Sequence, residues 1–161
     1  MKTLTLIFTF CIIVAFSQAK PAIVPRPELN KTLKVNRTQQ LQQNDQSSSC
    51  AYLLTIMTSC ISPAYTTDQI SLLFGDAHGH KAYIARLDDP ASGTFQQCAI
   101  DVFDVIGPCL GKICHLYLYR SGSNGWVPER VIVDDYYYGP IAFEYNIDIP
   151  EGGGLGFNYC G

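Results

Sequence analysis

The sequence predicts an all-β protein, an eight-stranded antiparallel β-sandwich with three disulfides. From residue 50 onward apolar residues recur at every second position, the period of a strand with one buried face, and there is almost no helical stripe. Gly, Pro, Asp and Asn separate these runs at short intervals, as in a sandwich or a barrel. Six cysteines follow residue 19, an even number that is typical of a disulfide-bonded secreted domain.

Eight apolar runs account for the predicted strands, at 52–56, 70–74, 83–87, 103–105, 116–118, 131–133, 141–147 and 155–159. The clearest is 141–147, where large apolar side chains alternate with Ala142, Glu144 and Asn146. Such alternation places one face of a strand in a core and the other in water.

Residues 1–19 have the features of a secretory signal peptide. Lys2 precedes an apolar run from Leu6 to Phe16, and a small-residue site ends at Ala19. A membrane anchor needs about twenty apolar residues, so this run is too short. We therefore expect cleavage after Ala19 and secretion to the extracellular space, the cell wall or apoplast.

Residues 20–49 are predicted to be a flexible polar arm, because Gln, Pro and Ser dominate and no aromatic residue occurs. The arm carries two sequons, so N-glycosylation is expected at Asn30 and Asn36. It holds five basic and two acidic residues, whereas residues 50–161 hold five basic and twelve acidic ones. An acidic domain argues against nucleic acid as a partner.

The six cysteines of the domain can be sorted by strand direction. If consecutive strands run up and down, Cys60 and Cys98 lie at one end of the sandwich, and only cysteines at the same end can meet. Cys60–Cys98 is therefore predicted. The other four lie at the opposite end, where Cys50–Cys160 and Cys109–Cys114 are favoured. A zinc site at Cys109 and Cys114 is the weaker interpretation, since there is no second close pair.

The order of these features resembles a PLAT/LH2 domain, the sandwich also found in lipoxygenases and lipases. The segments that carry the resemblance are TTDQISLLFGD at 66–76, RLDDPASGTFQQC at 86–98, DVFDV at 101–105 and HLYLYRSGSNGWVPERVIVDD at 115–135. The whole chain is also similar to the plant embryo-specific protein 3 family in its leader, polar arm, six cysteines and terminal FNYC.

This resemblance implies a non-enzymatic binding module for a membrane lipid or an extracellular protein, with a role in embryo or seed development. The alternative is a structural or glycan-binding extracellular protein without lipid affinity, and a monomer is expected. An unrecognised hydrolase is disfavoured, because no G-x-S-x-G motif occurs and no cysteine of the domain remains unpaired.

Calcium is the one ion that the sequence favours; no other cofactor is expected. The strand directions place five acidic residues at one end, and hard oxygen ligands on loops suit this ion: Asp68, Asp88, Asp89, Asp148 and Glu151. Some PLAT domains bind calcium in comparable loops, although ordinary solubilising charge explains the residues as well. His78 and His80, beside Asp76, could bind a metal but more simply form a hairpin turn around Gly79.

Aromatic residues supply the remaining binding candidates. Trp126 follows a Ser-Gly-Ser-Asn-Gly loop and is expected mainly as a lid on the core, with a contact role as the alternative. Tyr136, Tyr137 and Tyr138 are consecutive, so at least one must face water, where it could contact a partner or stack on a sugar.

Overall fold

The computed structural model describes residues 20–25, 49–89 and 91–161. Within them lie nine strands: β1 (Ala22–Pro25), β2 (Ser49–Thr58), β3 (Gln69–Asp76), β4 (Lys81–Ile84), β5 (Ile100–Pro108), β6 (Ile113–Ser121), β7 (Pro128–Asp134), β8 (Ile141–Glu144) and β9 (Gly153–Asn158). No helix in this part of the chain is long and apolar enough to cross a bilayer. The signal peptide predicted at 1–19 lies outside the described residues.

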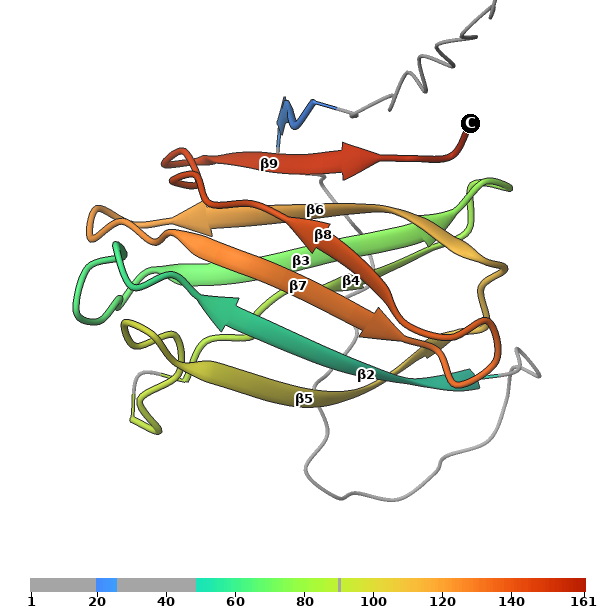
Figure 1. Cartoon of the computed structure of the whole chain (residues 1–161), viewed down its shortest axis with the longest axis horizontal. Helices are drawn as coiled ribbons and strands as arrows, with labels where there is room; N and C mark the ends of the chain where they lie inside the picture. Colours follow the sequence, from blue (N-terminus) through green and yellow to red (C-terminus); the bar gives the residue numbers. More distant parts are fainter. Residues whose placement is uncertain (1–19, 26–48, 90) are drawn as a thin grey trace, which may run out of the picture.

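The strands form two antiparallel sheets, ordered β1-β9-β6-β3-β4 and β5-β2-β7-β8. Figure 1 looks through both layers, with the second sheet in front of the first. The predicted all-β sandwich is therefore confirmed, with nine strands rather than eight.

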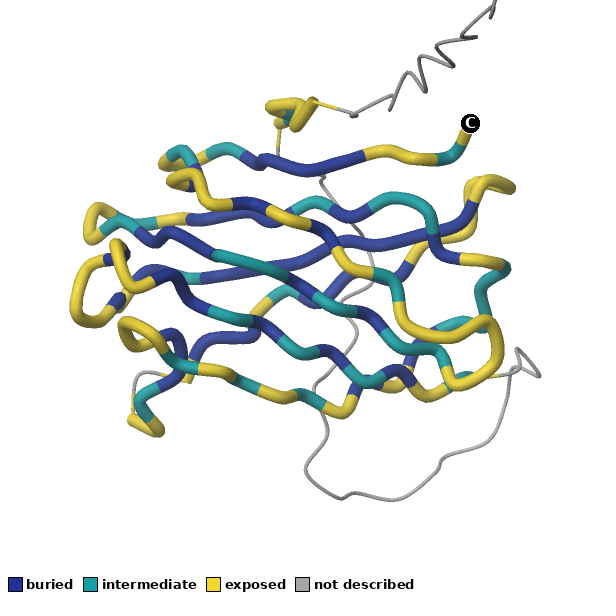
Figure 2. The backbone as a smooth tube through the Cα atoms, in the orientation of Figure 1, coloured by how far each residue is buried: buried dark blue, intermediate teal, exposed yellow. Residues whose placement is uncertain are grey.

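The core between the sheets is built from the alternating positions of the sequence. Leu54 and Ile56 of β2, for example, are fully buried, while Thr55 between them is only half-buried. Figure 2 shows this alternation along the strands of the second sheet. Strand β3 differs because it is buried on both faces from Ile70 onward.

A second, smaller apolar cluster explains the burial of β3 on its outer face. Leu73 packs there with Tyr83 and Tyr119, and Val24 of β1 lies against them. A side chain at Gly154 of β9 would collide with the ring of Tyr119, so glycine is needed for this close approach. The first sheet is thus covered by aromatic rings on its outer face.

The ninth strand corrects the prediction of a wholly flexible arm. Ala22 to Pro25 pair antiparallel with Gly156 to Gly153, which makes β1 an edge strand of the first sheet. The sequence indicates this strand only by the three apolar residues 22–24, and a run of three residues is too short to predict a strand. The rest of the arm, with Asn30 and Asn36, lies outside the described residues.

The disulfides are Cys50–Cys109, Cys60–Cys98 and Cys114–Cys160. Cys60–Cys98 is confirmed, whereas the favoured Cys50–Cys160 and Cys109–Cys114 pairs are wrong. The four cysteines do gather at one end, but Cys50 begins β2 in one sheet and Cys160 follows β9 in the other. Each disulfide joins two strands that are hydrogen-bonded neighbours in one sheet. Two of them link β2 to β5, one at each end of this strand pair, and the third links β6 to β9.

The β3–β4 hairpin is organised around one buried carboxylate. Asp76 accepts N–H hydrogen bonds from His78 at 2.8 Å, His80 at 3.0 Å and Gly111 at 2.7 Å, and its other contact is the His80 imidazole at 3.0 Å. Gly79 has a φ of 88°, as the turn requires. The hairpin interpretation of His78 and His80 is therefore confirmed.

Burial alone would raise the pKa of Asp76, but the hydrogen bonds from Gly111, His80 and His78 outweigh it and lower the pKa to about 2. A carboxyl whose pKa falls on folding stabilises the fold when it is ionised. This contribution is present above the ordinary pKa of 3.8 and is lost as the pH falls towards about 2.

Non-reducing peptide mapping tests the disulfide pattern. Trypsin cleaves after Lys112, between Cys109 and Cys114, and chymotrypsin cleaves after Tyr52 and Phe103, so the two enzymes together separate all six cysteines. We expect Cys109 peptides joined to Cys50 and Cys114 peptides joined to Cys160. Recovery of a Cys109–Cys114 cross-link would contradict the strand pairing.

Acid unfolding tests the role of Asp76. An Asp76→Asn variant should be less stable than the wild type at pH 7 by about 2 kcal/mol and nearly as stable as the wild type at pH 2. Thermal melts from pH 7 to pH 2 measure this difference, with Glu151→Gln, at an exposed carboxylate, as the control. A loss of stability that stays constant with pH would rule out the ionised Asp76 as its source.

Candidate binding surfaces at the two ends of the sandwich

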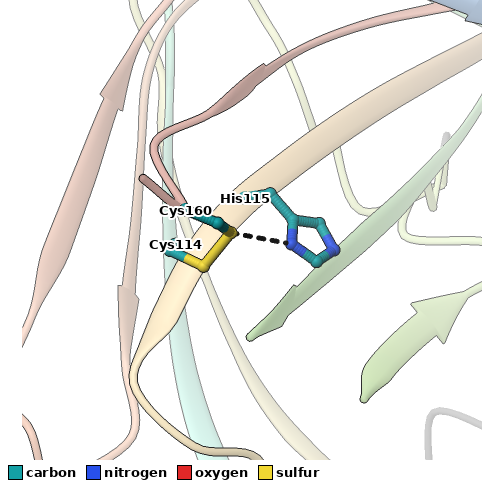
Figure 3. Close-up of side chains that lie close together, drawn as sticks. All are labelled: Cys114, His115 and Cys160. Carbon is teal, nitrogen blue, oxygen red and sulfur yellow. Dashed lines mark hydrogen bonds between the residues drawn. A yellow bond between two sulfur atoms is a disulfide. The ribbon is translucent and has the colours of Figure 1, made fainter. Parts of the chain in front are cut away.

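Cys114, His115 and Cys160 form the one group of three potential metal-ligating residues in the described part of the chain, with ligand atoms within 4.8 Å of one another. Figure 3 shows why it is a cross-link instead: the two sulfurs are bonded to each other. A disulfide sulfur is not the thiolate that binds zinc. His115 Nδ1 lies 3.5 Å from Cys160 Sγ, and burial lowers the pKa of its imidazole.

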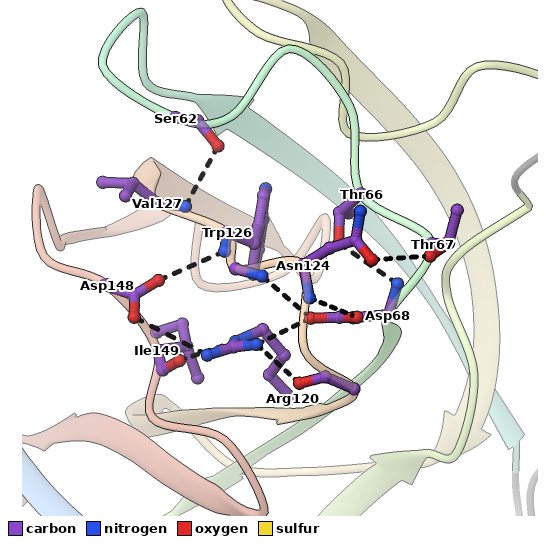
Figure 4. A network of polar contacts seen from close by, with 12 residues as sticks. Ser62, Thr66, Thr67, Asp68, Arg120, Asn124, Trp126, Val127, Asp148 and Ile149 are labelled. Atoms are coloured by element: carbon purple, nitrogen blue, oxygen red, sulfur yellow. Dashed lines mark hydrogen bonds and ion pairs between the residues drawn. The ribbon is translucent and has the colours of Figure 1, made fainter.

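The end of the sandwich where β6 stops is organised around Arg120, and we refer to it as the Arg120 end. The guanidinium is buried and donates to the Asp68 carboxylate at 2.6 Å, the Ile149 carbonyl at 2.7 Å and the Gly122 carbonyl at 2.8 Å (Figure 4). A second carboxylate, of Asp148, lies 3.6 Å away. Arg120 thus connects the loops before β3, after β6 and after β8.

Asp68 is equally enclosed. Besides Arg120, it accepts N–H hydrogen bonds from Asn124 at 3.0 Å and Gly125 at 3.1 Å. Burial opposes ionisation, but these hydrogen bonds together with the Arg120 charge prevail and lower the pKa of Asp68. The carboxylate therefore stays charged and is fully used inside the protein.

These contacts bear on the predicted calcium ligands. Asp68 and Asp148 bind Arg120, while Asp88 accepts a hydrogen bond from the Ile70 N–H at 2.9 Å and is bound by Arg86. The other two predicted ligands are exposed: Asp89 and Glu151. Among the described residues, no three of the five bring their oxygens within ligand distance of one another. In the structure the five residues are therefore not gathered into one site.

Trp126 lies at the same end and belongs to the core. Its side chain is 0% exposed, its indole N–H donates to the Thr58 hydroxyl at 3.1 Å, and its ring centroid lies 4.9 Å from that of Phe95. Its backbone N–H donates to Asp148. The ring is therefore buried in the core, as the lid interpretation expects and a surface contact does not, and Gly125 before it has a φ of 84°.

The opposite end carries a row of three exposed tyrosines, and we refer to it as the tyrosine end. Tyr136, Tyr137 and Tyr138, in the β7–β8 loop, are 63%, 83% and 52% exposed. The loop is braced, because Asp134 accepts the N–H of Tyr136 at 2.8 Å and Asp135 accepts those of Tyr137 and Tyr138 at 3.0 and 2.7 Å. The alternation of side chains along an extended chain predicted at least one exposed tyrosine, and the structure exposes all three.

A pocket of about 350 Å³ adjoins this loop. It is lined by Cys50, Tyr52, Leu110, Asp135, Tyr137 and Tyr138. The rings of Tyr137 and Tyr138 meet edge to face at 4.7 Å, which leaves an aromatic corner at its mouth. Its floor is fixed by Tyr52, whose hydroxyl donates to the Pro108 carbonyl at 2.6 Å and accepts from the Leu110 N–H at 3.0 Å.

The pocket could be foreseen only in part. The run of tyrosines predicted the exposed loop, but alternation predicted Tyr52 as a core residue, and no sequence pattern indicated that Leu110 would line a pocket. They meet the loop because Cys50–Cys109 brings the start of β2 to the end of β5, and β2 pairs with β7 on its other side.

Comparison with known proteins identifies the family. The profile of "Embryo-specific protein 3, (ATS3)" matches residues 36–160. Embryo-specific protein ATS3B of Arabidopsis thaliana is 40% identical over 99% of this chain and 83% of its own length. Embryo-specific protein ATS3A of the same plant is 38% identical over 96% and 83%. These relatives are named as embryo-specific proteins rather than as enzymes.

Solved structures with the same fold include parts of larger proteins. Coral 8R-lipoxygenase has a TM-score of 0.58 at 20% identity, over 67% of this chain and 17% of that one. Clostridium perfringens alpha-toxin has a TM-score of 0.54 at 16% identity, over 71% and 33%. At this identity the likeness shows the fold alone, a PLAT-like sandwich. The family profile and the plant relatives establish that this chain is a member of the embryo-specific protein 3 family.

Proposed function

We propose that this protein is a secreted, non-enzymatic binding module that docks on a membrane lipid surface with its tyrosine end. The observation that carries the proposal is the row of Tyr136, Tyr137 and Tyr138, each more than half exposed on a braced loop. Tyrosine suits a membrane interface because its ring is apolar and its hydroxyl remains in water. An exposed aromatic cluster of this kind is otherwise a cost to a soluble domain.

Charge favours neutral lipid headgroups over anionic ones. Residues 50–161 hold twelve acidic and five basic side chains, and Asp134 and Asp135 stand at the base of the loop. Coulomb repulsion therefore opposes close approach to an anionic surface.

Binding in this proposal does not depend on calcium. The structure of coral 8R-lipoxygenase is described as showing calcium activation through a C2-like domain. In the present chain Asp68 and Asp148, two of the residues predicted as calcium ligands, already contact Arg120. The ion would have to displace an internal cation to use them.

A glycan is the second candidate ligand, and the pocket favours it. The aromatic corner of Tyr137 and Tyr138 offers ring faces on which a sugar can stack, and Asp135 supplies a carboxylate for sugar hydroxyls. Such a partner fits a protein of the cell wall or apoplast. The family name supports a role in embryo or seed tissue for either ligand.

Liposome co-sedimentation tests the lipid proposal. Protein from the medium of a secreting host should pellet with neutral phosphatidylcholine vesicles equally well with calcium and with a chelator. A variant with Tyr136, Tyr137 and Tyr138 all changed to Ser should bind at least about tenfold more weakly, since three rings no longer leave water.

Tyr65→Ser is the matched control, because Tyr65 is also an exposed tyrosine but lies in the β2–β3 loop at the Arg120 end. It should bind like the wild type. Equal loss in both variants, or no binding of the wild type to vesicles, would refute the lipid role. Retention of the wild type on cell-wall polysaccharide, lost in the triple variant, would then support the glycan role.

A further inference from the structure

Within the described residues, strand β5 is an edge of the second sheet with a neighbour, β2, on one side only. It is nine residues long, whereas the other edge strands β1, β4 and β8 have four residues each. Short edges, or edges that carry proline such as Pro25 in β1, resist pairing with other chains. Strand β5 is neither short nor interrupted by proline before Pro108 at its end, and its charged residues are Asp101 and Asp104.

Alternate residues of β5 direct their backbone groups to this free edge. The Thr58 N–H donates to the Ala99 carbonyl at 2.9 Å, and the pairing continues in register from Met57↔Ile100 to Ser49↔Pro108. In an antiparallel pair every second residue bonds to the partner strand. The odd-numbered residues of β5 therefore bond to β2, and residues 100, 102, 104 and 106 turn their N–H and C=O groups outward.

These same four positions carry an exposed apolar strip. Ile100, Val102 and Ile106 are 60%, 59% and 58% exposed and share the outer face of the sheet with Asp104. Figure 2 shows exposed stretches recurring along β5 at the lower edge of the molecule. Three exposed β-branched side chains on one strand, beside backbone groups that no other described strand pairs, form a surface suited to strand addition.

We propose that β5 pairs antiparallel with β5 of a second copy of this chain, so that the two four-stranded sheets become one. The strand is complementary to itself about a two-fold axis at Phe103. Ile100 then faces the partner's Ile106, and Val102 faces the partner's Asp104.

The side-chain order selects this register over its neighbours. Moving the axis to Asp104 would place two carboxylates directly opposite each other, which is destabilising. Moving it to Val102 would carry Ile106 past the end of the partner strand. The chosen register forms the Ile100–Ile106 pair twice, once on each side of the two-fold axis. It also covers the β5 edge of both copies in a closed dimer.

Analytical ultracentrifugation of the full secreted protein tests the dimer. The wild type should sediment with the mass of two chains at tens of micromolar, and Val102→Lys with the mass of one. Val102→Ile keeps an apolar strand former and should remain dimeric. Val102→Pro should also be monomeric, because it removes an N–H that points away from β2 and so leaves the fold intact.

Ile147→Lys is the matched control, since Ile147 is an exposed isoleucine outside β5. It should remain dimeric. All variants should melt close to the wild type, because Val102 and Ile147 are exposed. A wild type with the mass of one chain at every soluble concentration, or a dimer that survives in both Val102→Lys and Val102→Pro, would overturn the proposal.

Discussion

The ion pair between Arg120 and Asp68 is the interaction on which one whole end of the sandwich depends. Withdrawing two charges from water costs several kcal/mol for each ion, so a buried pair is stable only when its remaining hydrogen-bonding groups are satisfied. Here the guanidinium also binds two carbonyls, and the carboxylate accepts two loop N–H groups. The pair thereby holds three loops together over Trp126 and closes the core at that end.

The two ends of the molecule consequently differ in character. At the Arg120 end the buried Asp68 and Arg120 bind each other, and at the tyrosine end aromatic rings project into water from a loop that Asp134 and Asp135 hold in place. The three disulfides strengthen each sheet separately, because every one joins neighbouring strands of the same sheet. Cohesion between the sheets rests on the apolar core and on loop networks such as that of Arg120.

Sequence patterns predicted the parts of this fold that depend on local periodicity. Alternation located β2 to β9, and strand direction paired Cys60 with Cys98. Strand direction could not determine how the other four cysteines pair, because it predicts at which end of the sandwich a cysteine lies but not in which sheet. Strand β1 was missed because four residues carry too little alternation. Asp68 was predicted to be an exposed ligand, because its partner Arg120 is distant in sequence and no local pattern links the two. Three consecutive tyrosines, in contrast, predict from the sequence alone that at least one ring is exposed.

A double-mutant cycle on Asp68 and Arg120 tests most directly whether this pair holds the end of the sandwich together. The free energy of unfolding would be measured in urea for Asp68→Asn, Arg120→Met and the double variant. Each single change should cost about 3–5 kcal/mol, because it leaves the partner charge buried without its counter-ion. The double variant should lose less than the sum of the two by about 1–3 kcal/mol. Additive losses, or an Asp68→Asn variant as stable as the wild type, would contradict this account.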